Sequence, residues 1–525
     1  MIVVRVLDLA ALLTVLLTVS ALIVWWARPE TLLLVFLAIV AARLLIEPAA
    51  VPRLAPRRVV AVGIAVYAAV FSFVTVTRHF TFQTHALDLG YYVQLLWNVA
   101  NGYGARVSLP EMHAWGDHLS PIMYLFVPAF WVAPGPVVLL VAQTLALALG
   151  AWPVFLIARR QLGDEAPAAA FAVLYLLNPS LHGINVRDFH AAALAIPLLL
   201  AALCGAEVGR PGLFAVAALG VLLCREDAAL AVFGLGAWLA LGRGRWLWGL
   251  GTSAVALGVL IVDIRWVIPW FRGEPYPHLG RYARHGASLG AIVGGLVLHP
   301  FRALATLIDL GRARYVLALL LPVAFLPLLA PRELIGALPA LAQNLFAADP
   351  ILFNHRTQYQ AFVLPFVVVA AVGGYQRLAR RTPGQWPVAA VVVAMLLSLA
   401  LASRTMNNLA LARWWPGPEH RAAYSVLARV PREAAVSAQD PYVPHLSLRR
   451  HVSVFPVGIE NADHVLLNVR SYPWRGLPGV TMTRDGDTVT IALPPEREYR
   501  YDVASEAGPH LLLARRADSA QSERR

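Results

Sequence analysis

Acidic, histidine and arginine side chains recur at the ends of long apolar runs in this chain. Carboxylates can take a proton from an attacking hydroxyl, and arginine guanidinium groups hold phosphate oxygens bidentately, so the combination suits a phosphorylated substrate. Each group could instead pair with a neighbour at a loop end, and the sequence leaves that alternative open. The candidates are Asp88, His113, Asp117, His118, Arg187, Asp188, His190, Arg225, Glu226, Asp227, His278, Arg281, Arg284, His285, His355 and Arg356.

Two short groups combine a carboxylate with an imidazole, and both donors suit a divalent ion. The candidate metal ligands are therefore Asp117, His118, Asp188 and His190, although their spacing is not diagnostic. The sequence has no HExxH, CxxC pair, phosphate-binding glycine loop, GxGxxG or GxSxG elbow. Hydrolase, nucleotide-driven pump and dehydrogenase functions therefore lack the residues that would perform them.

Composition places these groups in a membrane protein. Of 525 residues, 59% are hydrophobic and 14% charged, with a mean hydropathy of +0.63, which indicates a multi-spanning chain. The formal charge of +13 comes from arginine alone and lies largely in short loops, which favours a role in topology over nucleic-acid binding. Cys204 and Cys224 fall inside apolar segments, which excludes a disulfide framework or a cysteine metal cluster.

Arginine placement predicts which loops face the cytoplasm. The positive-inside rule assigns to that side Arg53, Arg57, Arg58, Arg159, Arg160, Arg210, Arg243, Arg245, Arg380 and Arg381. The apolar runs then make about 13 spans, with the N-terminus inside and the C-terminus outside. The candidate residues fall on the outer side. Because a charge facing lipid at mid-bilayer costs about 2.5–3.5 kcal/mol, we expect them to line a shared polar cavity.

A polar and aromatic stretch, residues 79–135, interrupts the apolar runs. Asp88 opens a helical pattern there with an apolar stripe, formed by Tyr92, Leu95, Leu96, Val99 and Tyr103. A second stripe is polar, formed by Gln94, Asn98 and Asn101. The pattern predicts a helix on the membrane surface, half in lipid and half in water, that stops at Asn101-Gly102. Asp88 then either caps this helix or does chemistry.

Five regions are expected along the chain: N-terminal spans (1–78), an external loop with interfacial helices (79–135), a transmembrane bundle (136–413), a small extracytoplasmic α/β domain (414–515) and a disordered tail (516–525). The α/β domain is predicted to contain a helix near 419–429. Its expected strands are 434–438, 451–455, 463–469, 488–494 and 510–515.

Six ordered motifs carry a family resemblance: LDLGYYVQLLWNVANGYG, GDHLSP, LNPSLHGINVRDFHAAALAIPLLL, LLCREDAALAV, NHRTQYQAFVLPF and VSAQDPYVPHLSLRRHVSVFP with ADHVLLNV. Over about residues 70 to 470 the chain resembles the bacterial and archaeal predicted membrane proteins grouped as the domain of unknown function numbered two thousand and seventy-nine. The layout is similar to the GT-C superfamily of polyprenyl-phosphate-dependent glycosyltransferases.

That similarity implies a fold and a set of roles. In GT-C enzymes the first large external loop carries an acidic residue, a base or metal ligand, and Asp88 matches that position. The chain departs from the usual pattern by placing three apolar runs before the loop and by lacking a second carboxylate beside Asp88. The resemblance implies that Arg225, Arg281, Arg284 or Arg356 holds the lipid phosphate.

The leading hypothesis is an α-helical polytopic, GT-C-like protein of the cell membrane. It would transfer a sugar from a polyprenyl-phosphate donor to an external acceptor, with Asp88 as the catalytic base. The predicted substrate-binding residues are His118, Asp188, His190, Arg225, Glu226, Arg281, Arg284, His355 and Arg356. A transporter or flippase of a lipid-linked or polar solute is one alternative, and an inactive GT-C-like scaffold is another. The donor sugar, acceptor, metal dependence and oligomeric state stay open.

Overall fold

The computed structural model describes residues 2–46, 55–382, 384, 386–402, 415–474, 476–495 and 497–516. The predicted tail after residue 516, and the predicted domain boundary at Trp414, lie outside this part of the chain. Two compact units are present. The helical unit comprises Met1–Thr75, Trp115–Met123 and Leu140–Arg413, and the sheet unit comprises Val76–Ala114, Tyr124–Leu139 and Trp414–Arg525.

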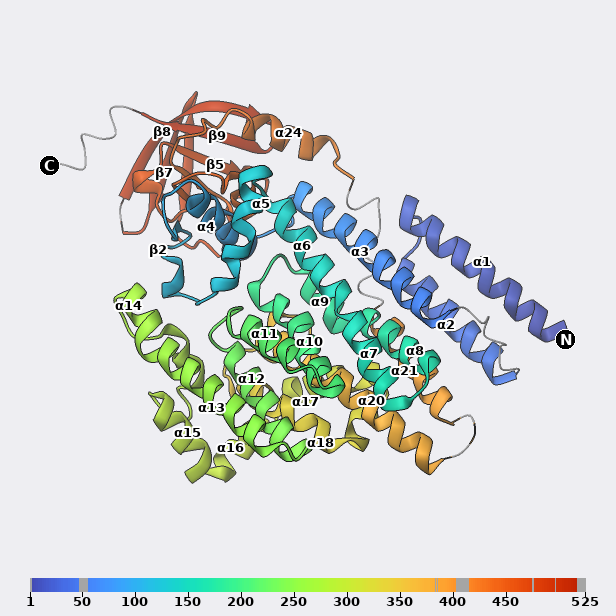
Figure 1. The fold of residues 1–525 in the computed structure, drawn as a ribbon. Coiled ribbons are helices and arrows are strands. Elements are labelled where there is room, and N and C mark those ends of the chain that lie inside the picture. The colour runs from blue at the N-terminus through green and yellow to red at the C-terminus, as the bar shows by residue number, and fades with distance from the viewer. Residues whose placement is uncertain are drawn as a thin grey trace. The chain divides into compact units, whose positions relative to one another are not determined.

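The first unit is built of helices (Figure 1). The label η marks a short 3-10 or π helix. Four elements, α3, η2, η3 and α6, run across the division between the units. The elements are α1 (Ile2–Val24), α2 (Pro29–Ile46), α3 (Pro56–Phe80), η2 (Ala114–Gly116), η3 (Pro121–Phe126), α6 (Pro136–Leu149), α7 (Ala151–Leu162), α8 (Glu165–Leu176), α9 (Pro179–Val186), η4 (Ala191–Leu194), α10 (Ala195–Val208), α11 (Pro211–Leu222), α12 (Ala228–Ala237), η5 (Trp238–Gly242), α13 (Trp246–Val262), η6 (Asp263–Val267), α14 (Ile268–Arg272), η7 (Pro277–Tyr282), α15 (Leu289–Leu298), α16 (Pro300–Leu307), α17 (Leu310–Leu320), η8 (Leu321–Val323), η9 (Leu326–Leu329), α18 (Pro331–Leu334), η10 (Ile335–Ala337), α19 (Leu338–Phe346), η11 (Gln358–Phe362), α20 (Leu364–Arg381) and α21 (Trp386–Leu401).

The prediction of about 13 spans is not confirmed. Within the described residues, 5 helical segments are long and apolar enough to cross a membrane, or up to 7 when two bent helix pairs each count as one. Several predicted spans are shorter helices, such as Pro211–Leu222 with 12 residues. A helix rises 1.5 Å per residue, so about 20 residues are needed to cross the roughly 30 Å hydrocarbon layer.

Helices α12 and α13 pack closely against each other (Figure 1). A Cβ atom at Gly236 would lie 2.6 Å from the carbonyl oxygen of Gly249, and one at Gly249 would lie 2.6 Å from that of Gly236. Both distances are shorter than real Cβ contacts. Glycine at these two positions therefore lets the two backbones meet and fixes the spacing of α12 and α13. Side chains of both helices line the groove that is described below.

The sheet unit combines the polar stretch with the C-terminal part of the chain. Its elements are η1 (Ala86–Gly90), α4 (Tyr91–Ala100), β1 (Arg106–Ser108), β2 (Glu111–His113), α5 (Val127–Val132), α24 (Pro418–Leu427), β3 (Val436–Ala438), η12 (Asp440–Tyr442), α25 (Val443–Leu446), β4 (Val452–Val454), η13 (Ile459–Asn461), β5 (His464–Asn468), η14 (Val469–Ser471), β6 (Thr481–Asp485), β7 (Thr488–Leu493), β8 (Arg497–Ala507) and β9 (His510–Arg515). β1 and β2 form an antiparallel pair. The main sheet has the order β4-β3-β5-β9-β8-β7-β6, in which β4, β3 and β5 are parallel and the other pairings antiparallel.

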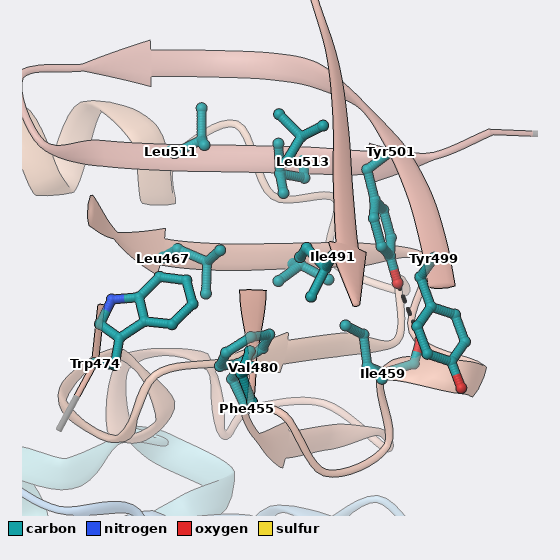
Figure 2. Packing of buried hydrophobic residues seen from close by; sticks show 12 residues of the cluster. Phe455, Ile459, Leu467, Trp474, Val480, Ile491, Tyr499, Tyr501, Leu511 and Leu513 are labelled. Atoms are coloured by element: carbon teal, nitrogen blue, oxygen red, sulfur yellow. Dashed lines mark hydrogen bonds between the residues drawn. The ribbon is translucent and has the colours of Figure 1, made fainter. Parts of the chain in front are cut away.

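Figure 2 shows the core of this sheet. Aromatic and aliphatic side chains from β5, β7, β8 and β9 pack with Phe455, Ile459 and Trp474 from the connections. The hydroxyl of Tyr501 donates a hydrogen bond of 3.0 Å to the carbonyl oxygen of Ile459, which satisfies a buried polar group at the edge of that core. All five predicted strands are present, and the predicted helix appears as α24.

The predicted surface helix forms, but its polar stripe does not face water. Helix α4 ends before Asn101 and Gly102, as predicted. Gln94 and Asn98 are 0% and 4% exposed, however. The Nε2 of Gln94 donates to the carbonyl oxygens of Arg449 and Arg450, and the Nδ2 of Asn98 donates to that of Arg106. The half-lipid, half-water interpretation is therefore wrong for these residues, because their amides bind backbone groups of the same unit.

Candidate functional site

A buried ion pair lies in the loop between α11 and α12 of the helical unit. The guanidinium of Arg225 donates from Nε and Nη2 to the two carboxylate oxygens of Asp227, at 2.5 and 2.6 Å. Gln343 on α19 donates to the same carboxylate at 2.8 Å. Arg225 also lies over the rings of Tyr359 and Phe362. Its charge is thus neutralised and its planar faces are covered, which suits a structural role.

Glu226, between these two residues, binds a histidine. Its Oε1 lies 2.8 Å from Nδ1 of His118 and accepts a hydrogen bond of 2.9 Å from the hydroxyl of Tyr276. Its Oε2 accepts from the backbone N–H of Leu119 at 3.2 Å. The carboxylate therefore holds His118 in one orientation and directs its other ring nitrogen elsewhere.

His118 also belongs to a group of side chains that could hold a metal ion. One donor atom from each of Asp117, His118 and His278 lies within 4.8 Å of the others, and among the described residues this is the one group of three His, Cys, Asp or Glu side chains so placed. The rings of His118 and His278 stack with centroids 4.3 Å apart. Nε2 of His278 lies 3.4 Å from Oδ1 of Asp117, outside hydrogen-bond alignment. One carboxylate and two imidazoles, with Glu226 behind His118, fit a divalent ion.

Burial lowers the pKa of His278 and favours its neutral form, whereas the charged forms of its neighbours are favoured. Burial opposes protonation of His118, but the negative charge of Glu226 and its hydrogen bond outweigh burial and raise the pKa of His118. Burial also opposes ionisation of Glu226 and Asp227, yet the positive charges of His118 and Arg225 respectively hold both carboxyl pKa values below their usual range. The pKa of Asp117 is likewise lowered, against burial, by its contact with His278.

An apolar groove adjoins the cluster. It has a volume of about 320 Å³, within the range typical of ligand pockets. Side chains of α12, α13, α15 and α19, mostly Leu, Ile, Val, Ala and Phe, form its walls. Six polar or charged residues line it as well: Asp227, Tyr276, His278, Arg281, Tyr282 and Gln343.

The structure distinguishes among the four arginines proposed for a phosphate. Arg281 lines the groove and lies 4.0 Å from Asp349, a distance that leaves its guanidinium weakly engaged. Arg225 is bound bidentately by Asp227, and Arg284 is exposed and does not line the groove. Arg356 packs against Gly183, at the position where a Cβ atom would stand. Arg281 is therefore the arginine placed to meet a ligand in this groove.

Asp188 and His190 lie in a different environment of the same unit. Both are buried, and Gln143 binds the backbone of both residues, with Nε2 donating to the Asp188 carbonyl and Oε1 accepting from the His190 N–H. Asp188 has a φ of 61°, which is uncommon for a residue other than glycine. Neither residue belongs to the group that could hold an ion, and His355, half-buried in the loop after α19, does not line the groove.

Asp88 is in the sheet unit and is half-buried. The helix begins before it, at Ala86, so Asp88 is not the capping residue. Oδ1 of Asp440 accepts from the N–H of Ala86 at 2.8 Å instead, and Oδ2 of Asp440 lies 2.6 Å from Nδ1 of His85.

Sequence reasoning missed Tyr276, Tyr282 and Gln343. Tyrosine and glutamine are uncharged at neutral pH, so a search for acidic, basic and histidine side chains passes over them. The two tyrosines do lie within a few residues of His278 and Arg281, in the segment PYPHLGRY. Gln343 is in a helix, and nothing in its neighbours distinguishes it.

Comparison with solved structures shows which fold the protein has. The structure resembles ArnT from Cupriavidus metallidurans, a GT-C glycosyltransferase, in the apo state (TM-score 0.50) and bound to undecaprenyl phosphate (TM-score 0.49). In each comparison the identity is 15%, with 87% of this chain and 98% of ArnT covered. The likeness to the apo form shows a mostly helical protein of GT-C-like fold with a C-terminal sheet domain, which confirms the predicted fold class apart from the number of spans.

The family follows from sequence. Residues 78–477 match the family model described as "Predicted membrane protein (DUF2079)", and the chain belongs to this family. The resemblance stated from the six motifs is confirmed. No curated protein matches the chain significantly.

Proposed function

We propose that this protein is an integral-membrane glycosyltransferase that binds a polyprenyl-phosphate-linked sugar in the groove of the helical unit and transfers the sugar to an acceptor outside the cytoplasm. The groove carries this proposal, because it joins a long apolar wall to a set of polar groups that includes Arg281. An isoprenoid chain needs the wall, and a phosphate needs a cation with several N–H donors.

The charge distribution supports a phosphorylated lipid over a neutral one. Arg225 and Asp227 neutralise each other, and Glu226 is paired with His118. Arg281, held at 4.0 Å from Asp349 and 5.6 Å from the ring centre of Tyr359, keeps donors for a ligand. The hydroxyls of Tyr276 and Tyr282 already donate, to Glu226 and to the carbonyl oxygen of Gln343, so they shape the groove around that cation.

Two further roles are part of the proposal. Asp88 would take the proton of the acceptor hydroxyl as the sugar is transferred. Asp117, His118 and His278 would hold a divalent ion, which would supply a Lewis acid for phosphate oxygens. Metal analysis of purified protein tests the second role: His278→Ala should lower the bound-metal content, and an unchanged content in that variant would contradict it.

Lipid copurification tests the groove. Full-length protein extracted in mild detergent should carry polyprenyl phosphate or its glycosylated form, identified by mass spectrometry. Arg281→Gln should reduce the lipid bound per protein, since a hydrogen bond to a charged group contributes about 1.5–3 kcal/mol, or roughly a 10- to 100-fold change in affinity. Arg284→Gln is the matched control, because Arg284 is three residues away and exposed.

Two results would contradict the proposal. Equal loss of lipid in Arg281→Gln and Arg284→Gln would mean that the groove does not select a phosphate. Copurification of a different lipid class, unaffected by Arg281→Gln, would favour the transporter hypothesis or a scaffold.

A further inference from the structure

A second pocket lies entirely within the sheet unit. It has a volume of about 210 Å³, and polar groups make up much of its lining. Gln439 directly follows β3 and Asn468 ends β5, and the backbone N–H of Asn468 donates to Oε1 of Gln439 at 2.6 Å. The carboxyl ends of two adjacent parallel strands therefore form one side of this pocket.

This pocket lies where the connections that follow two neighbouring parallel strands lead in opposite directions. From β3 the chain proceeds to β4 on one side of β3, and then crosses to β5 on the other side. The connections after β3 and β5 thus lead in opposite directions and leave a crevice between them. In open α/β sheets, ligands bind in such a crevice at the carboxyl ends of parallel strands.

A buried histidine in the pocket lacks one hydrogen bond. His510 is 4% exposed, and its Nδ1 lies 2.5 Å from the hydroxyl of Tyr442. Its Nε2 is buried and has no partner within hydrogen-bond geometry in the described part of the chain. Buried polar nitrogens are usually satisfied, so this atom is suited to donate to or accept from a ligand in the pocket that His510 lines.

Aromatic and acidic side chains are also part of the lining. Phe82 has a φ of 56°, a strained conformation for phenylalanine, and its ring stacks at 6° with that of His420. Strained residues concentrate at ligand sites. Glu419 supplies a carboxylate whose Oε2 already accepts from Arg470 at 2.7 Å. Because this ion pair has no net charge, a neutral ligand fits better than an ionic one, and the carboxylate oxygens can only accept hydrogen bonds from it.

We propose that this pocket binds a single neutral sugar ring. Sugar hydroxyls can donate to Glu419 and meet Nε2 of His510, and an apolar sugar face can lie against Phe82. The pocket volume suits one monosaccharide unit. The inference does not depend on the lipid groove, because every residue that carries it belongs to the sheet unit.

Saturation-transfer NMR on the full-length detergent-solubilised protein tests this assignment, with glucose, galactose and N-acetylglucosamine as probes. At least one of the three should bind saturably. Glu419→Gln should weaken that binding about tenfold, the effect of losing a charge-assisted hydrogen bond. Glu460→Gln, an exposed acid of the same unit, is the control and should bind normally.

His510→Gln is the second pocket variant, with His464→Gln on β5 as its control, and melting temperatures confirm that each variant is folded. Saturable binding of none of the probes would overturn the proposal. So would binding of wild-type strength in both folded pocket variants. Binding that is lost in Arg281→Gln and kept in Glu419→Gln would place the sugar in the groove, which would overturn this site while leaving the proposed function intact.

Discussion

The candidate site of the helical unit and the polar stretch of the sheet unit bury different kinds of polar group. In the helical unit the buried groups at the site are charged: Arg225, Glu226 and Asp227 are at most 6% exposed and pair with neighbouring ions. In the sheet unit the groups that hold the polar stretch are largely neutral amides and hydroxyls. Gln94 and Ser108, for example, bind backbone groups near residue 450.

This difference predicts which substitutions lower the stability of the protein strongly and which lower it only a little. A buried charge whose partner is removed keeps its full desolvation penalty, whereas a neutral amide loses only hydrogen bonds. Substitutions at buried ions should therefore destabilise the helical unit strongly. A substitution that lowers turnover without lowering stability should be found at a charged residue outside these buried ion pairs.

Asp88 gives the largest expected effect. Because Asp440 accepts from the first N–H of the helix and asparagine keeps the size of Asp88 and one accepting oxygen, Asp88→Asn should leave the melting temperature close to that of the wild type. If Asp88 is the base, transfer from a polyprenyl-phosphate sugar should fall by about 10²- to 10⁴-fold, the range of general-base assistance. The measurement is turnover with radiolabelled lipid donor in membranes.

Asp440→Asn provides the control for Asp88, since it changes the other aspartate at this helix start and keeps an oxygen that can accept from Ala86. Its turnover should remain near that of the wild type. Wild-type turnover in Asp88→Asn would remove the base from the mechanism and leave the groove as the support for the proposed function.

Asp227→Asn should produce the next largest effect, on stability. It removes the charge that neutralises Arg225, which is 3% exposed, and breaking a buried pair in this way costs about 3–5 kcal/mol. Thermal denaturation of the detergent-solubilised protein measures the loss. Asp309→Asn is the control, because Asp309 is exposed, asparagine can still cap α17, and the buried Arg312 keeps its hydrogen bonds to the carbonyl oxygens of Leu345 and Ala347. Its effect should stay below about 1 kcal/mol.

The stability that the Asp227 carboxylate contributes should depend on pH in a defined direction. The pKa of Asp227 in the folded protein lies below its ordinary value of 3.8, since the charge of Arg225 outweighs burial. The stability from this carboxylate is therefore fully present above pH 3.8 and is lost as the pH falls through the lowered pKa. The difference between wild type and Asp227→Asn should be constant near neutral pH and narrow only in strong acid. A constant difference throughout would show that the carboxylate charge is not what stabilises the loop.

Much of the sheet unit was predictable because its strands carry a clear pattern. The buried runs HVLLN and HLLLAR are dense in Val and Leu and end at polar residues. The strands β1, β2, β6 and β8 were missed. β8 alternates inward Tyr499, Tyr501 and Val503 with outward charges, so its two-residue period was present in the sequence but was obscured by the number of charged residues.

The site was only partly predictable, for a physical reason. Positive-inside bias and apolar run lengths place ionisable groups near loops, but they carry no information about which loops meet. Arg225 and Arg281 look alike in sequence, and only the bidentate contact with Asp227 separates the bound arginine from the available one. Amphipathic periodicity likewise identified the polar stripe of α4. It could not distinguish water from buried carbonyl groups as the partner of that stripe.

Gln94→Leu tests that last distinction and should give the smallest of these effects. Leucine keeps much of the side-chain volume but leaves the N–H of Ser108 and the carbonyl oxygens of Arg449 and Arg450 without the amide that satisfies them. Buried groups left in this state cost about 1–3 kcal/mol, less than the broken ion pair at Asp227. Thermal denaturation should show the loss, and limited proteolysis should cut the sheet unit earlier than in the wild type. Asn101→Leu is the matched control, because Asn101 is exposed and its amide donates to the carbonyl oxygen of Trp97, one turn earlier. If the stripe faced water after all, both variants would behave alike and neither would expose a new cleavage site.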